Sequence, residues 1–135
     1  MANLNDICRN IVENTEHALA AGVVDLDSGL LLGVSHGVNY FNQEILDTVA
    51  AASVEMFRGR STQTVEGMLA ELRGTKPGNS IQDLHFSTDQ THHFMTVVPG
   101  KPSALAVLVT RNKVRLGFGW TSLQHRLEEI AAACP

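Results

Sequence analysis

The protein has 135 residues, of which 44% are hydrophobic and 18% charged, and its formal net charge is -4. This hydrophobic content excludes intrinsic disorder, which requires few apolar residues and a high net charge. The small acidic excess is opposite to the basic balance typical of nucleic-acid binding, so we expect no DNA or RNA partner. A chain of this length predicts one domain that covers residues 1–135.

We expect a soluble protein of the cytoplasm. The N-terminal residues contain no basic stretch followed by an apolar run, so they predict no signal peptide. The apolar stretches are far shorter than the roughly 20 residues that cross a bilayer, so no membrane partner is expected. The two cysteines, Cys8 and Cys134, are too few for a disulfide scaffold and lack the C-x-x-C spacing of redox and zinc sites.

The N-terminal segment predicts a helix followed by a β-hairpin. Apolar residues three and four positions apart form one helical stripe, and Asn3 or Asn5 can cap its first turn. The stripe consists of Leu4, Ile7, Cys8, Ile11 and Val12. Residues 18–26 and 30–36 are two short apolar runs. The Asp27-Ser28-Gly29 turn between them favours a hairpin, because glycine accepts positive φ and aspartate hydrogen-bonds its own backbone.

A second helix is predicted over residues 42–59. Asn42 can cap its start, and apolar residues then follow at helical spacing. A helical patch over residues 64–72 continues the pattern after a break at residues 59–61. Residues 74–79 are expected to form a loop, because their proline cannot continue a helix and their two glycines weaken one.

Three strands and a last helix complete the chain. The strands are predicted at Ile81–Ser87, Thr91–Val98 and Ser103–Thr110, and their short connections make neighbours antiparallel. The second connection is Pro99-Gly100, the preferred central pair of a type II turn. The last helix is predicted to begin near Asn112, with one continuous apolar stripe at alternating intervals of four and three. This stripe consists of Leu116, Trp120, Leu123, Leu127, Ile130 and Cys134.

These elements predict an α+β fold in the order α-β-β-α-β-β-β-α, with a five-stranded antiparallel sheet. Residues 30–32 and 104–109 are apolar without alternation. A strand that is solvated on one face would alternate between apolar and polar residues. We therefore expect helices on both faces of the sheet.

The chain shows little sign of catalytic or metal chemistry. It contains no Gly-rich phosphate loop and no serine nucleophile elbow. The adjacent His92 and His93 point to opposite faces of a strand, so they cannot bind one ion together there. His85 can lie diagonally across from His92, and this pair without a third ligand is a weak zinc or copper candidate. We predict a protein that is not an enzyme, with no catalytic residue, no metal and no cofactor.

The second helix carries two adjacent apolar flanks, although a helix that lies on a sheet needs only one. Either residues 61–80 of the same chain cover the extra flank, or a second copy of the protein does. We favour the second copy, because two-fold contacts are the commonest in soluble oligomers. Strand 81–87 supports this choice, since one of its edges is open for pairing. The predicted dimer residues, some of which must face the protomer's own sheet, are Ile45, Val49, Ala52, Ser53, Met56, Phe57, Gln82, Leu84 and Phe86.

The element order, the hairpin at residues 23–32 and the ending Ala104–Thr110 with residues 112–117 resemble the roadblock family of dynein light-chain-like proteins. The bacterial and archaeal branch is the most similar. The resemblance covers nearly the whole chain, and its motifs are moderately specific because profilin-like sensor domains share parts of them. It implies a sheet with the second helix on one face and the first and third on the other. Residues 59–80, with Pro77 and four glycines, depart from the compact family pattern.

The resemblance also implies a function. Family members form homodimers through the second helix and third strand, which correspond to residues 42–58 and 81–87. Prokaryotic members commonly associate with small Ras-like GTPases, and some activate them by repositioning the GTPase's own catalytic groups. We therefore expect a non-enzymatic homodimeric regulator or scaffold that binds a small Ras-like GTPase. The alternatives are a small-molecule-sensing profilin-like domain and a metal-dependent enzyme that uses His85 and His92.

Overall fold

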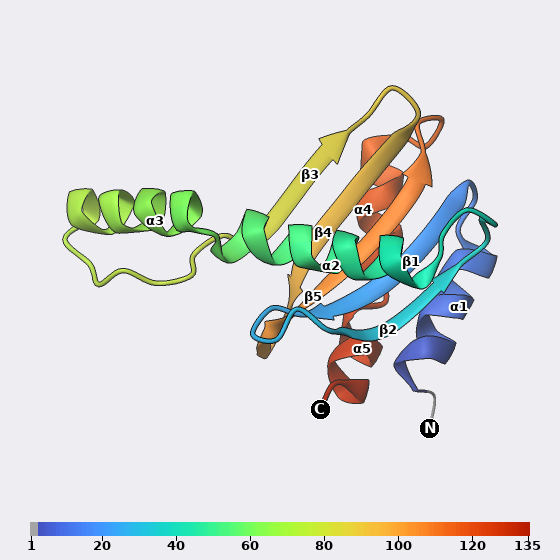
Figure 1. Ribbon diagram of the computed structural model, residues 1–135, viewed down its shortest axis with the longest axis horizontal. Helices are drawn as coiled ribbons and strands as arrows, with labels where there is room; N and C mark the ends of the chain where they lie inside the picture. The colour runs from blue at the N-terminus through green and yellow to red at the C-terminus, as the bar shows by residue number, and fades with distance from the viewer. Residues whose placement is uncertain (1–2) are drawn as a thin grey trace.

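The computed structural model describes residues 3–135, and a five-stranded antiparallel sheet with the order β2-β1-β5-β4-β3 forms its centre (Figure 1). The strands are β1 (Ala18–Asp25), β2 (Leu31–His36), β3 (Asp83–Ser87), β4 (Thr91–Val98) and β5 (Lys101–Arg111). The helices are α1 (Leu4–Asn14), α2 (Gln43–Arg58), α3 (Arg60–Arg73), α4 (Leu116–Gln124) and α5 (Leu127–Ala133). Within the described residues, none of these helices has the length and apolar character that crossing a bilayer requires.

Two hydrophobic cores lie on opposite faces of the sheet. Helices α1, α4 and α5 cover one face, where Ile11, Phe94 and Leu108 are buried. Helix α2 crosses the other face, where Phe57, Met95 and Leu105 are buried. The predicted α+β fold with helices on both faces is confirmed. Strand β5 lies at the centre, so both of its faces are covered and its sequence is apolar without alternation.

Helix α1 packs very closely on the hairpin of β1 and β2. Asn3 caps the helix by accepting a hydrogen bond from the Asp6 amide, whereas Asn5 accepts one at 3.0 Å from the Val34 amide on the free edge of β2. A Cβ atom at Gly33 would lie 2.6 Å from the Cβ of Leu4, so only glycine allows this approach. Helix α1 therefore covers part of the outer edge of β2.

The predicted turns are confirmed by the backbone. Gly29 and Gly100 both have positive φ, 75° and 76°, in the β1–β2 and β4–β5 connections. A positive φ is the conformation that glycine adopts at little cost, and in the Pro99-Gly100 pair it is the one that a type II turn requires.

The break after α2 is shorter than predicted. Gly59 alone separates the helices, with an extended ψ of 168°, and α3 begins at Arg60 instead of Thr64. A Cβ atom at Gly59 would lie 2.3 Å from the Glu55 carbonyl oxygen, so this sharp change of direction requires glycine. Helix α2 itself begins after the predicted cap, because the Asn42 side chain accepts a hydrogen bond from the Ile45 amide.

The prediction of one continuous C-terminal helix from Asn112 is wrong. The helix begins at Leu116 and divides into α4 and α5 at residues 125–126. The Arg126 amide donates to the Leu123 carbonyl, three residues back, and this tighter turn interrupts the α-helical path. Leu116, the first residue of the predicted stripe, is 46% exposed. Leu123 and Ile130 are buried against the sheet as predicted.

Candidate interaction surface on α2, α3 and β3

The structure separates the two flanks of α2. The inner flank holds Ala50, Ser53 and Phe57, which are 0%, 0% and 3% exposed against the protomer's own sheet. The Ser53 hydroxyl has its hydrogen-bond partner within the helix, because it donates to the Val49 carbonyl at 3.0 Å. Ser53 and Phe57, which were included among the predicted dimer residues, therefore have no surface to offer a second copy.

The outer flank of α2 is open to solvent. Ile45 and Val49 are 38% and 43% exposed, Ala52 is exposed and Met56 is half-buried. Their spacing of four, three and four residues places them on one side of the helix. No part of residues 60–80 covers this flank, because α3 extends away from it (Figure 1). The alternative in which the same chain covers the extra flank is therefore not what the structure shows.

Hydrogen bonds hold the C-terminal end of α2 to the sheet. The Arg58 guanidinium donates to an Asp27 carboxylate oxygen at 2.5 Å and to the Pro102 carbonyl at 3.0 Å. The other Asp27 oxygen accepts from the Ser103 hydroxyl at 2.7 Å. The hydrogen bond from Ser103, followed by the one from Arg58, lowers the pKa of Asp27 below its ordinary value. These contacts fix the direction in which α2 leaves the sheet and α3 begins.

Helix α3 is an arm that projects past the β3 edge of the sheet (Figure 1). It carries an apolar stripe at intervals of three, one and three residues. The stripe comprises Val65, Met68, Leu69 and Leu72, which are 52%, 61%, 37% and 83% exposed. The sequence predicted a helix here, but this exposed apolar stripe was not predicted, although the spacing of its four residues indicates it.

A buried carboxylate on α3 binds the segment that returns from this helix to β3. Glu66 is 4% exposed, and its two oxygens accept from the Ser80 amide at 2.9 and 3.0 Å, the Ser80 hydroxyl at 2.6 Å and the Ile81 amide at 3.1 Å. The Ser80 hydroxyl is the main reason that the pKa of Glu66 lies below its ordinary value. The segment that returns from α3 to β3 is therefore tied to the middle of the helix.

Strand β3 presents the second part of the surface. The Gln82 carbonyl accepts from Val97 of β4, and the Thr88 amide donates to Thr91 at the other end of the strand pair. Bonded residues alternate along an antiparallel ladder, so the backbone groups of Asp83, His85 and Ser87 point outward from the sheet. The structure thus has one edge, β2, partly blocked by Asn5, and one edge, β3, with unpaired backbone groups.

The three predicted dimer residues of this strand differ in exposure. Gln82, just before the strand, is exposed. Leu84 and Phe86 are half-buried and pack into the core beneath α2. The structure therefore brings Leu84 and Phe86 to the same face of the sheet as α2, next to the open edge.

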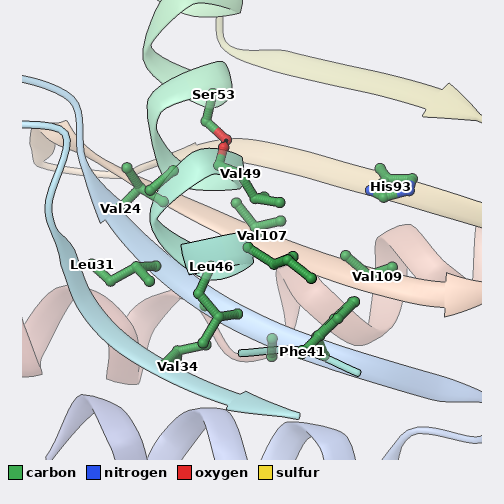
Figure 2. Close-up of a pocket in the computed structure, with 15 residues that line it drawn as sticks. Val24, Leu31, Val34, Phe41, Leu46, Val49, Ser53, His93, Val107 and Val109 are labelled. Atoms are coloured by element: carbon green, nitrogen blue, oxygen red, sulfur yellow. Dashed lines mark hydrogen bonds between the residues drawn. The ribbon is translucent and has the colours of Figure 1, made fainter. Parts of the chain in front are cut away.

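An apolar cavity lies between the N-terminal half of α2 and the sheet (Figure 2). Its volume is about 70 Å³, and Ile45 and Val49 are among its lining residues. Small-molecule pockets usually enclose about 300–1,000 Å³. The cavity is thus too small for most metabolites.

The histidines of β3 and β4 form two separate groups. The Nε2 atom of His85 lies 3.2 Å from Nδ1 of His92, as the predicted diagonal contact requires. His93 points to the other face and stacks on Phe86 with ring centroids 4.3 Å apart. Burial lowers the pKa of both His85 and His93, and the neighbouring imidazoles add to this effect. Across residues 3–135, no cluster of three or more His, Cys, Asp or Glu side chains could hold a metal ion.

The cysteines carry no reactive signature in the described part of the chain. Cys8 is buried in the α1 core, and burial raises the pKa of its thiol to about 12. Burial also raises the pKa of Cys134. Thiolate character is what makes a cysteine nucleophilic or ligating, and a raised pKa disfavours the thiolate at both positions.

Comparison with known proteins finds relatives by structure. No protein-family model and no curated protein match the sequence. A roadblock/LC7 domain from Streptomyces avermitilis superposes with a TM-score of 0.71 and 14% identity, over 97% of this chain and 97% of that one. MglB from Myxococcus xanthus superposes with a TM-score of 0.68 and 16% identity, over 96% and 85% of the two chains. A structure described as MglB with tetrameric arrangement superposes with a TM-score of 0.68 and 20% identity, over 94% of this chain and 84% of that one. The chain therefore has the roadblock/LC7 fold, and the predicted resemblance is confirmed at the level of fold.

Proposed function

We propose, with the roadblock fold as the starting point, that this protein is a homodimeric regulator or scaffold without catalytic activity of its own, which binds a small Ras-like GTPase. The observation that carries the dimer is the outer flank of α2, where Ile45 and Val49 remain 38% and 43% exposed, and the same sheet also ends in an unpaired edge strand. Exposed apolar side chains that gather on one flank mark an interaction site.

A two-fold arrangement would satisfy both features at once. Pairing of β3 with its copy would extend the sheet and occupy the outward backbone groups of Asp83, His85 and Ser87. The arm α3 extends beyond this edge, so its apolar stripe would lie over the second copy. Each surface would then cover its counterpart, as an isologous interface requires.

The charges of α2 fit an antiparallel contact with a second α2. Exposed Glu44 and Asp47 lie at its N-terminal end, and exposed Arg60 follows its C-terminal end, where Glu55 is also exposed. In an antiparallel pair, Arg60 of one copy lies toward Glu44 and Asp47 of the other. Complementary charges of this kind favour one orientation over others.

Substitution of Val49 tests the dimer. We expect Val49→Glu to weaken association by at least about tenfold, which corresponds to about 1.4 kcal/mol, because it places a charge in an apolar contact. Sedimentation equilibrium measures the association constant. The matched control is Leu116→Glu on α4, a 46% exposed leucine on the other face of the sheet, which should leave association unchanged. A wild-type protein that remains monomeric at high micromolar concentration would exclude the homodimer.

Binding to Ras-like GTPases of the same cell tests the partner. Each GTPase is immobilised with GDP or with a non-hydrolysable GTP analogue, and binding of the wild-type protein is measured. We expect binding that depends on the bound nucleotide, because only the switch segments of such GTPases differ between the two states. Absence of nucleotide-dependent binding to any of them would refute this part of the proposal.

Small-molecule sensing is supported less well. The cavity under α2 is apolar, as an apolar sensor would require, but its volume is about 70 Å³. An engineered apolar cavity of about 150 Å³, roughly twice this volume, binds benzene. The rim residues Ile45 and Val49 also lie on the proposed dimer flank, so a second copy would cover them.

A further inference from the structure

We propose that a groove at one end of the sheet binds a small phosphate monoester that carries a planar ring, as nucleoside monophosphates do. The groove lies where β5 ends and β4 begins, beside the loop that connects β2 to α2. Its volume is about 380 Å³, within the range of about 300–1,000 Å³ that small-molecule pockets usually enclose.

The groove is separate from the surfaces already described. It shares no lining residue with the apolar cavity under α2. None of its lining residues belongs to α2, α3 or β3, which form the proposed dimer surface. The inference is therefore independent of the homodimer, and either one can fail without the other.

Two cations without a carboxylate partner line the groove. Arg111 and Lys113 are both exposed, and within residues 3–135 no carboxylate forms an ion pair with either of them. A phosphate monoester carries about −1.5 to −2 charges at neutral pH, which two cations match better than they match a single carboxylate. A guanidinium also binds two phosphate oxygens at once, and an ammonium binds phosphate as a point charge.

Hydrogen bonds hold the segment that carries these cations. The Arg111 amide donates to the His17 carbonyl at 2.9 Å, and the Asn112 amide donates to the Gln90 carbonyl at 2.9 Å. The Asn112 side chain adds a hydrogen bond at 2.8 Å to the Asp89 carbonyl. The backbone that supports the cations is thus fixed before a ligand binds, which lowers the entropic cost of binding.

An aromatic ring also lines the groove. Tyr40 is 65% exposed, although its backbone lies in a tight turn in which the Phe41 amide donates to the Val38 carbonyl at 3.3 Å. The Tyr40 ring meets the Phe41 ring edge-on, with centroids 5.1 Å apart, and Phe41 packs on the core under α2. An exposed aromatic ring is a surface on which a planar base stacks. Leu19 and Val38 add apolar contact area to the lining.

The cations and the ring together select the class of ligand. Inorganic phosphate would leave Tyr40 uncovered, and an uncharged nucleoside would leave Arg111 and Lys113 without a counter-charge. A phosphate monoester with a planar ring uses both parts of the lining. We therefore expect it to bind more tightly than either of its halves.

Calorimetric titration of the wild-type protein tests this class of ligand. The probes are AMP, GMP, CMP and UMP, the corresponding nucleosides, and inorganic phosphate, all at one ionic strength because salt screens exposed charges. We expect at least one monophosphate to bind at least tenfold more tightly than its nucleoside and than inorganic phosphate. The proposal is overturned if no monophosphate binds, or if either half binds as tightly as the whole.

Charge variants test which residues bind the phosphate. We expect Arg111→Gln and Lys113→Gln each to weaken binding of the tightest monophosphate at least tenfold, because each removes a charge-assisted contact. Arg115→Gln is the matched control, since Arg115 is an exposed cation of the same β5–α4 connection that does not line the groove. Its effect should stay below about twofold. An equal loss in all three variants would indicate a general attraction to positive charge and would refute the site.

Variants of Tyr40 test the contact with the ring. We expect Tyr40→Ala to weaken monophosphate binding about tenfold and to leave binding of inorganic phosphate unchanged, because base stacking on an aromatic side chain is lost. Tyr40→Phe keeps the ring and should retain the wild-type affinity. Urea unfolding checks that each variant is folded, which we expect because the altered side chains are exposed. Equal monophosphate affinities of Tyr40→Ala and the wild type would refute the stacking contact.

Discussion

Glu66 is a charged residue that the fold has buried and satisfied. It lies in the middle of α3, and Ser80 and Ile81 supply all four of its hydrogen bonds. These donors prefer the ionised carboxylate, so the pKa of Glu66 is lowered, with the Ser80 hydroxyl as the main cause. An unpaired carboxylate at 4% exposure would be costly, which makes the arm dependent on the charge of this group.

Acid should release the return segment of the arm. A group whose pKa is lowered on folding contributes stability that is complete above its unfolded pKa and is lost as pH falls through the folded pKa. For Glu66 this loss begins below its ordinary value of 4.5. We expect the amide signals of Ser80 and Ile81 in NMR spectra to shift toward the positions of unstructured peptide over this range.

Glu66→Gln should remove this pH dependence. The variant cannot present two charged oxygens to Ser80, and a hydrogen bond to a charged group contributes about 1.5–3 kcal/mol. We expect amide exchange of Ser80 and Ile81 to be at least about tenfold faster near neutral pH. Glu71→Gln, an exposed position on the same helix, is the control and should leave exchange unchanged. Equal exchange in both variants would show that Glu66 does not hold the segment.

Helix α4 contains two glycines whose roles differ because of what lies beside them. A Cβ atom at Gly119 would lie 2.2 Å from Cζ of Phe94, which is fully buried under the helix. A Cβ atom at Gly117 would meet nothing within 4 Å. The first glycine permits close packing of helix on sheet, and the second only weakens the helix.

Alanine substitutions should therefore act in opposite directions. We expect Gly119→Ala to lower the free energy of unfolding by about 1–3 kcal/mol, because the buried Phe94 ring must move. Gly117→Ala should raise it by up to about 1 kcal/mol, since alanine favours a helix interior. Urea unfolding followed by circular dichroism measures both. Destabilisation by both variants to the same extent would contradict this account of α4.

The arm α3 should affect association without affecting the stability of the domain. Met68 and Leu72 are 61% and 83% exposed, so a Met68→Gln and Leu72→Gln double variant removes little buried area in one protomer. We expect its free energy of unfolding, measured under monomeric conditions, to change by less than about 0.5 kcal/mol. Its dimer should dissociate more readily in sedimentation, because the stripe loses its apolar contact with the second copy. Unchanged association would show that the arm lies outside the interface.

At the scale of the whole molecule, local patterns in the sequence predicted most elements. The Asn42 cap, the Pro99-Gly100 turn and the uninterrupted apolar run of β5 are local signals, and each is confirmed. The break at Arg126 was not predicted, because the apolar stripe continues through it and only the packing of the two halves distinguishes them. The break between α2 and α3 was predicted to be longer than the single residue Gly59. Its length depends on the ψ angle of that one residue, which the sequence does not reveal.

The sequence by itself determined the α+β fold, the order of its five strands and the surplus of apolar residues on α2, because these follow from turn chemistry and hydrophobic periodicity. Tertiary structure alone decided which flank is buried: Ser53 and Phe57 are buried against the sheet, and Ile45 and Val49 stay partly exposed. Tertiary structure also decided that α3 projects past β3. It likewise brought His85, the central residue of the open edge strand β3, into contact with His92. The physical reason is that periodicity reports which residues share a face, whereas the direction of that face depends on contacts between distant segments.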